Sequence, residues 1–191
     1  MTALAWVRPG RLGGALLAVL LAVPAWAGTA GFVIRSAELA LQGNLYQVNA
    51  NVQFDLSETA VEAVQSGVPL VFEIRAELLR PRGWWWDERL AVVRRSMQLQ
   101  FHALSGRYLV EDLDSGGRQS FATLTDALFA LGTVRDLSLI EAGRLQSGES
   151  YVVRVRADLD IEALPTPVRL WAYVSSEWRL HSGWYQWQLE L

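Results

Sequence analysis

Few residues in this chain carry the side chains that catalysis or metal binding usually requires. The sequence contains no cysteine, so disulfides, thiolate metal sites and cysteine nucleophiles are excluded. His102 and His181 are its two histidines. Neither has a partner at the spacing of a known metal-binding or hydrolase motif. We therefore expect no metal site, no cofactor and no catalytic residue of the usual kinds.

Carboxylates offer the remaining route to chemistry. Glu111, Asp112 and Asp114 precede Gly116-Gly117, and oxygen ligands in a glycine-containing turn can hold Ca²⁺. Because the spacing of an EF-hand loop is absent, an ordinary acidic hairpin end is the favoured interpretation. Paired carboxylates suffice for glycoside hydrolysis, but one sequence does not show which carboxylates meet. The sequence predicts a protein that is not an enzyme, with a carboxylate-dependent hydrolase as the least favoured alternative.

Tryptophan is the residue type that stands out. Trp84, Trp85 and Trp86 are consecutive, and neighbours on an extended chain point to opposite faces, so local geometry cannot bury all three. A second aromatic centre lies near the C-terminus, where alternation over 170–174 and 184–191 indicates strands whose side chains mostly belong to the core. The possible interaction surface is predicted to comprise Trp84, Trp85, Trp86, Trp171, Tyr173 and Trp184.

Period-2 alternation of apolar and polar residues dominates the chain, which is typical of antiparallel strands with one wet face. It runs through residues 46–56, 72–78, 96–103 and 151–162. Gly43-Asn44 and Ser105-Gly106 predict hairpins. Short helices are expected after Ser57, ending before Gly67 and Pro69, and after Thr123, over 124–131.

About eight strands with one apolar face each must close that face against another sheet. The predicted fold is therefore mainly β: an antiparallel β-sandwich of about eight strands with two short helices. A helix-backed antiparallel sheet or a barrel is the alternative.

The N-terminus predicts export. Arg8 and Arg11 precede the apolar run 12–23, which ends at Pro24, and Ala25-Trp26-Ala27 matches a signal-peptidase site. An uncleaved anchor is the alternative, but the run is shorter than the roughly 20 residues that cross a bilayer. We expect a cleavable signal peptide over 1–27 and a single β-rich periplasmic domain over 28–191.

The charge balance excludes one class of partner. The whole chain has a formal net charge of −3, and removal of the two signal-peptide arginines makes the remaining domain more acidic still. Such a domain lacks the basic footprint of a nucleic-acid-binding protein. Contact with the membrane is expected only through the signal peptide while it is uncleaved.

Two C-terminal blocks, 164–170 (LPTPVRL) and 178–187 (WRLHSGWYQW), resemble the proteobacterial family called domain of unknown function 4390. The helix after Ser57, the segment 67–70 and the tryptophans 84–86 are similar to it too. The resemblance implies a small exported protein of Gram-negative bacteria, with no assigned activity and no catalytic residues to transfer. Genes of that family often lie near one for a membrane sensor kinase of the nitrogen-regulation type.

Together these observations predict a non-catalytic protein-interaction module of the Gram-negative envelope. Its expected partner is an envelope protein, for example the periplasmic domain of a sensor kinase. The alternative is a periplasmic ligand-binding domain that uses the C-terminal aromatic face for a glycan, a peptide or a lipid. An exposed apolar patch would favour the first function, and a deep aromatic-lined pocket the second.

Overall fold

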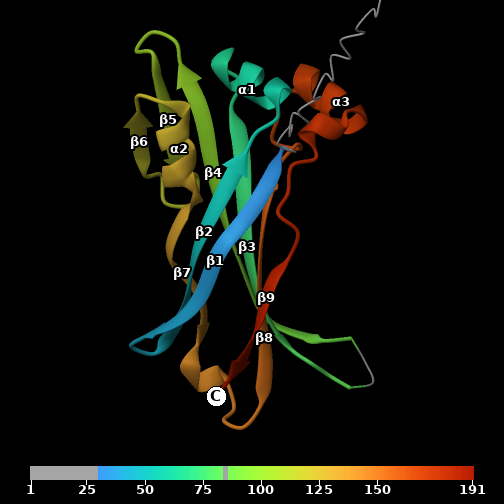
Figure 1. Ribbon diagram of the computed structural model, residues 1–191. Coiled ribbons are helices and arrows are strands. Elements are labelled where there is room, and N and C mark those ends of the chain that lie inside the picture. The colour runs from blue at the N-terminus through green and yellow to red at the C-terminus, as the bar shows by residue number, and fades with distance from the viewer. Residues whose placement is uncertain (1–29, 84–85) are drawn as a thin grey trace, which may run out of the picture.

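Two antiparallel sheets packed face to face form the protein (Figure 1). The computed structural model describes residues 30–83 and 86–191. One sheet has three strands in the order β1-β2-β7, and the other has six in the order β6-β5-β4-β3-β8-β9. The strands are β1 (Gly31–Gln42), β2 (Leu45–Asp55), β3 (Leu70–Arg80), β4 (Glu88–His102), β5 (Arg107–Asp112), β6 (Arg118–Phe121), β7 (Thr133–Glu141), β8 (Ser150–Leu159) and β9 (Tyr185–Glu190).

This architecture confirms the predicted antiparallel sandwich, and the described residues do not close into a barrel. Alternating side chains of β2, β3 and β8 point between the sheets and are buried, as their sequence pattern requires. Phe32, Phe54 and Phe72 join the two sheets, with ring centroids 4.7 to 5.8 Å apart. Tyr151 is buried in the same cluster, and its hydroxyl accepts a hydrogen bond from the Gln146 N–H at 2.9 Å.

Both predicted helices are present. Helix α1 (Glu58–Gln65) begins at Ser57, whose hydroxyl oxygen accepts a hydrogen bond from the Ala60 N–H at 3.2 Å. Helix α2 (Leu124–Gly132) is capped in the same way by Thr123, which accepts from the Asp126 N–H at 3.1 Å. Short 3₁₀ turns follow β7 and the third helix: η1 (Ala142–Arg144) and η2 (Ser176–Trp178).

The prediction of a strand over 170–174 is wrong. These residues belong to a third helix, α3 (Thr166–Val174), which begins with proline in its first turn. Proline suits that position because its missing N–H would be unpaired there in any case. The second predicted C-terminal strand is confirmed as β9, which pairs with β8.

The helices mark one end of the molecule. α1, α3 and η2 gather there, and the described chain enters at the same end through Ala30 (Figure 1). The hairpin joining β3 to β4 projects from the opposite end. Among the helices of the described residues, none has the length and apolar content needed to cross a bilayer.

Candidate interaction surface

Trp86 lies in the connection between β3 and β4, at the end of the molecule opposite α3 (Figure 1). Its side chain is 95% exposed. Trp84 and Trp85, which the sequence analysis assigned to the same surface, lie outside the described residues. Of the predicted tryptophan triplet, the structure therefore places one member, fully in solvent.

Three charged side chains fix the base of this hairpin. Arg80 and Glu88 are cross-strand partners, and the Glu88 carboxylate accepts hydrogen bonds from Arg80 Nε at 3.0 Å and Arg82 Nη2 at 2.6 Å. The hydrogen bonds from Arg80 and Arg82 lower the pKa of Glu88 below its usual value. Reciprocally, the Glu88 carboxylate raises the pKa of Arg80. Trp86 therefore lies in a loop whose two flanking strand ends are joined by these ion pairs.

Helix α3 presents a second uncovered apolar surface. Leu170, Trp171, Tyr173 and Val174 are 65%, 74%, 51% and 73% exposed, whereas Ala172 is fully buried against the core. The sequence analysis expected most C-terminal aromatic side chains in the core but assigned Trp171 and Tyr173 to the possible interaction surface, and both of these are exposed. They remain exposed because a short helix has room for one buried face, and here Ala172 and Val168 occupy it.

Trp184 has a different environment. It precedes β9 on the outer face of the six-stranded sheet, and its ring stacks on the Arg154 guanidinium, with Arg154 Cζ 4.3 Å from the ring centroid. Arg154 in turn donates to the Glu77 carboxylate from Nε at 2.8 Å and from Nη2 at 2.5 Å. Trp184 is half-buried, so it covers an ion pair rather than standing free.

Glu77 is the residue that sequence reasoning missed. Alternation correctly places it on the outer face of β3, but it is only 2% exposed. It lies opposite Arg154 in register, with Arg89 Nε 3.5 Å away on the β4 side. A carboxylate that is buried and paired on a sheet surface signals a covering layer, which here includes Arg154 and Trp184.

The predicted surface is therefore divided. The β3–β4 connection that carries Trp86 and helix α3 lie at opposite ends of the sandwich (Figure 1), whereas Trp184 stacks on Arg154 of the six-stranded sheet. The structure does not bring these residues into one patch. It provides two separate apolar surfaces and one tryptophan with a structural contact.

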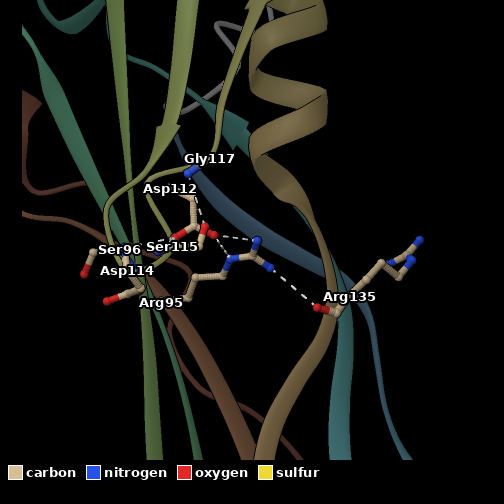
Figure 2. Close-up of polar contacts among 7 residues, drawn as sticks. All are labelled: Arg95, Ser96, Asp112, Asp114, Ser115, Gly117 and Arg135. Atoms are coloured by element: carbon tan, nitrogen blue, oxygen red, sulfur yellow. Dashed lines mark hydrogen bonds and ion pairs between the residues drawn. The ribbon is translucent and has the colours of Figure 1, made fainter.

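The acidic cluster near Gly116-Gly117 is a hairpin end, as predicted. Asp112 accepts hydrogen bonds from the Asp114 and Ser115 N–H groups, both at 3.0 Å, and from Arg95 Nε at 3.0 Å (Figure 2). Burial raises the pKa of Asp112, but the Ser115 N–H, the Arg95 guanidinium and the Asp114 N–H together outweigh it and lower the pKa. Both carboxylate oxygens of Asp112 thus accept hydrogen bonds from within the protein.

Arg95 extends this cluster to the other sheet. Its Nη1 reaches the Arg135 carbonyl oxygen at 3.5 Å (Figure 2), so the guanidinium links β4 and β5 with β7. Nearby, the Asp114 carboxylate accepts from the Ser96 N–H at 2.9 Å. The arrangement resembles a structural clamp between sheets and leaves no carboxylate pair open for a cation.

The two histidines lie on different elements, and His181 forms an isolated backbone bridge with Asp158. His102 Nδ1 lies 2.9 Å from the Ser105 hydroxyl in the β4–β5 hairpin. His181 Nδ1 accepts from the Gly183 N–H at 3.3 Å. Within residues 30–83 and 86–191, no three His, Cys, Asp or Glu side chains are grouped closely enough to hold a metal ion.

Glu73, Asp158 and Asp160 line a hollow on the six-stranded sheet, and the first two form a cross-strand carboxylate pair. Glu73 and Asp158 lie on β3 and β8, beside the hollow of about 330 Å³. Each accepts from an arginine two residues away on its own strand, Glu73 from Arg75 and Asp158 from Arg156. Both carboxylates are thus engaged in ion pairs with arginines on the sheet surface.

Larger hollows flank α2. One of about 660 Å³ is lined by Phe121 and Phe129, and another of about 450 Å³ by Phe54, Leu128 and Phe129. Neither is lined by Trp86, Trp171, Tyr173 or Trp184. The four aromatic residues of the predicted surface that the structure describes thus do not line these hollows.

Comparison with known proteins agrees with this picture of a β domain without assigned chemistry. Residues 29–188 match the family described as Domain of unknown function (DUF4390). The match covers most of the chain, so the protein belongs to this family, as its C-terminal blocks predicted. No curated protein and no solved structure matches the chain.

Proposed function

We propose that this protein is a non-catalytic interaction module of the Gram-negative cell envelope, exported by residues 1–27 and acting as a periplasmic domain over 28–191. Its partner is an envelope protein, for which the periplasmic domain of a membrane sensor kinase is the leading candidate. Export is supported by the apolar run 12–23 and the Ala25-Trp26-Ala27 site. The family resemblance supports the envelope setting.

The exposure of Trp86 is the observation that carries this proposal. Indoles are frequent binding hot spots, and Trp86 combines 95% exposure with a base fixed by Arg80, Arg82 and Glu88. These charges provide the polar rim that usually surrounds an apolar interface centre. A non-catalytic role is supported by the clusters described above, whose carboxylates are all engaged in structural ion pairs or turns.

Photo-crosslinking in cells tests the partner. A photoreactive phenylalanine analogue replaces Trp86 in one strain and Leu104 in a control strain. Leu104 is the matched control because it lies at another hairpin tip and is 96% exposed. We expect a specific crosslinked protein from position 86 and none from position 104. Equal capture at both positions, or none at position 86, would contradict the proposal.

The processing of the N-terminus has its own test. Mass spectrometry of the protein recovered from the periplasmic fraction should find an N-terminus at or near Gly28. Recovery of the intact chain with the inner membrane would show instead that the apolar segment is retained as an anchor.

A further inference from the structure

The outward face of the second half of α3 is apolar. At 3.6 residues per turn, Leu170, Trp171, Tyr173 and Val174 occupy one continuous arc of about 160°. Arg169, the one charged residue of the helix, is half-buried and turned back along the chain. It donates to the Glu162 carbonyl oxygen at 2.8 Å and to the Thr166 hydroxyl at 3.3 Å. The four side chains of the arc are themselves uncharged.

The position of the N-terminal chain indicates what this arc faces. Ala30, Ser176 and Glu177 line the same hollow of about 340 Å³, and η2 follows directly after α3. Six residues separate the apolar run 12–23 from Ala30, a connection that spans at most about 25 Å when fully extended. When residues 12–23 lie in the membrane, either during export or as a retained anchor, the α3 end of the domain is held close to the bilayer.

The charged residues around the arc indicate which kind of binding partner suits it. The Glu162 carboxylate accepts a hydrogen bond from the Tyr173 hydroxyl at the edge of the arc, and Glu58, Glu177 and Arg179 line the hollow beside η2. The carboxylates in this part of the surface repel anionic lipid headgroups and would equally repel an acidic protein. Trp and Tyr, however, favour the interfacial layer of a bilayer, where a ring is half apolar and half wet. Trp171 and Tyr173 provide that pair, and Leu170 with Val174 provides the aliphatic contact.

We propose that the face of α3 formed by Leu170, Trp171, Tyr173 and Val174 inserts shallowly into the interfacial layer of a lipid bilayer. Binding is driven by apolar burial and not by charge, so zwitterionic lipid suffices. This contact goes beyond the signal peptide as a route to the membrane, and it is independent of the partner proposed for Trp86. Docked in this way, the domain points the β3–β4 hairpin away from the bilayer.

The absence of cysteine allows a direct test in the full chain, because one introduced cysteine is then the only labelling site. Val174→Cys, labelled with the polarity-sensitive fluorophore NBD, is mixed with phosphatidylcholine vesicles. We expect its emission to rise several-fold and to shift to the blue. Phe129→Cys, on the exposed side of α2 (77%), and Trp86→Cys are the matched controls, and their emission should not change.

A second variant checks that the arc itself makes the contact. Trp171→Gln in the Val174→Cys background should reduce the vesicle response several-fold while leaving the thermal midpoint unchanged, because the indole is exposed. Replacing part of the phosphatidylcholine with phosphatidylglycerol should not strengthen the response.

Four results would overturn the proposal. These are an unchanged signal at position 174, an equal shift at all three labelled positions, and a response that needs anionic lipid and disappears in salt. The fourth is a shift that occurs without vesicles and grows with protein concentration, which would identify a second copy of the chain as the occupant of α3.

Discussion

Asp112 shows how much of this sandwich depends on one ionised side chain. Its carboxylate joins a hairpin turn to Arg95, and through Arg95 to the backbone of β7. Because its pKa is lowered in the folded state, the charge stabilises the fold above the pKa of the unfolded chain. That contribution is lost as pH falls through the lower, folded pKa. Part of the acid sensitivity of the protein should therefore belong to this single residue.

Asp112→Asn is expected to lower the free energy of unfolding by about 1.5–3 kcal/mol at pH 7, since hydrogen bonds to a charged group are lost. The variant should also lose less stability than the wild type when the pH falls below about 4. Urea titrations at several pH values measure both effects. Glu111→Gln is the control: it removes an exposed pair with Arg118 and should cost at most about 1 kcal/mol. Equal losses in both variants would contradict the assignment.

Gly132 is required for a different reason, which is space. A Cβ added there would lie 2.0 Å from the Val52 carbonyl oxygen, so α2 and β2 would have to separate. Gly132→Ala should destabilise the protein by about 1–3 kcal/mol, as overpacking usually does. At Gly143, where a Cβ meets nothing within 4 Å, the same change should be neutral or stabilise by up to about 1 kcal/mol. Thermal unfolding of the two variants gives the comparison, and a similar midpoint for both would be inconsistent with the tight approach.

Among the elements, β3, β8 and β9 share an outer face on which Trp184 covers the pair of Arg154 with buried Glu77. Trp184→Ala should therefore lower stability by about 1–3 kcal/mol, through lost packing and a more exposed ion pair. Trp86→Ala, at a side chain in solvent, should stay within about 0.5 kcal/mol. Chemical denaturation followed by circular dichroism avoids the change in fluorescence that removing an indole causes. If Trp184→Ala left stability unchanged, Trp184 would return to the candidate interaction surface.

The strands could be predicted from the sequence because burial of one sheet face imposes a period of two on residues 46–56, 72–78 and 151–159. The capped helices could be predicted because Ser57 and Thr123 are residue types that favour the N-cap position, and Thr123 is followed three residues later by Asp126. Helix α3 could not, since apolar residues lie on both of its faces: Val168 and Ala172 pack against the core, and Leu170, Trp171, Tyr173 and Val174 are exposed. The role of Trp184 was equally hidden, because its partner Arg154 is distant in the chain and meets it only through the pairing of β8 with β9.

At the scale of the whole molecule, the chain passes repeatedly between the two sheets. β1 and β2 form most of the small sheet, β3 to β6 build the large one, β7 returns to pair with β2, and β8 and β9 complete the large sheet. Neither sheet is finished until the last third of the chain is in place. Phe32, Phe54 and Phe72 bind the two layers into one core cluster.

This topology predicts that the sandwich unfolds as one cooperative unit. Tryptophan fluorescence and far-ultraviolet circular dichroism should report the same denaturation midpoint, because neither sheet can persist when the other is lost. Phe54→Leu, at the centre of the phenylalanine cluster, should lower both midpoints together, by a loss of about 1–2 kcal/mol. Refolding should be slow for a domain of this size. β2 and β7 are far apart in the sequence, so their pairing loses loop-closure entropy before the stabilising contacts between them form. A fluorescence transition that precedes the dichroism change, or a variant that shifts one probe alone, would show that the α3 end or one sheet unfolds independently.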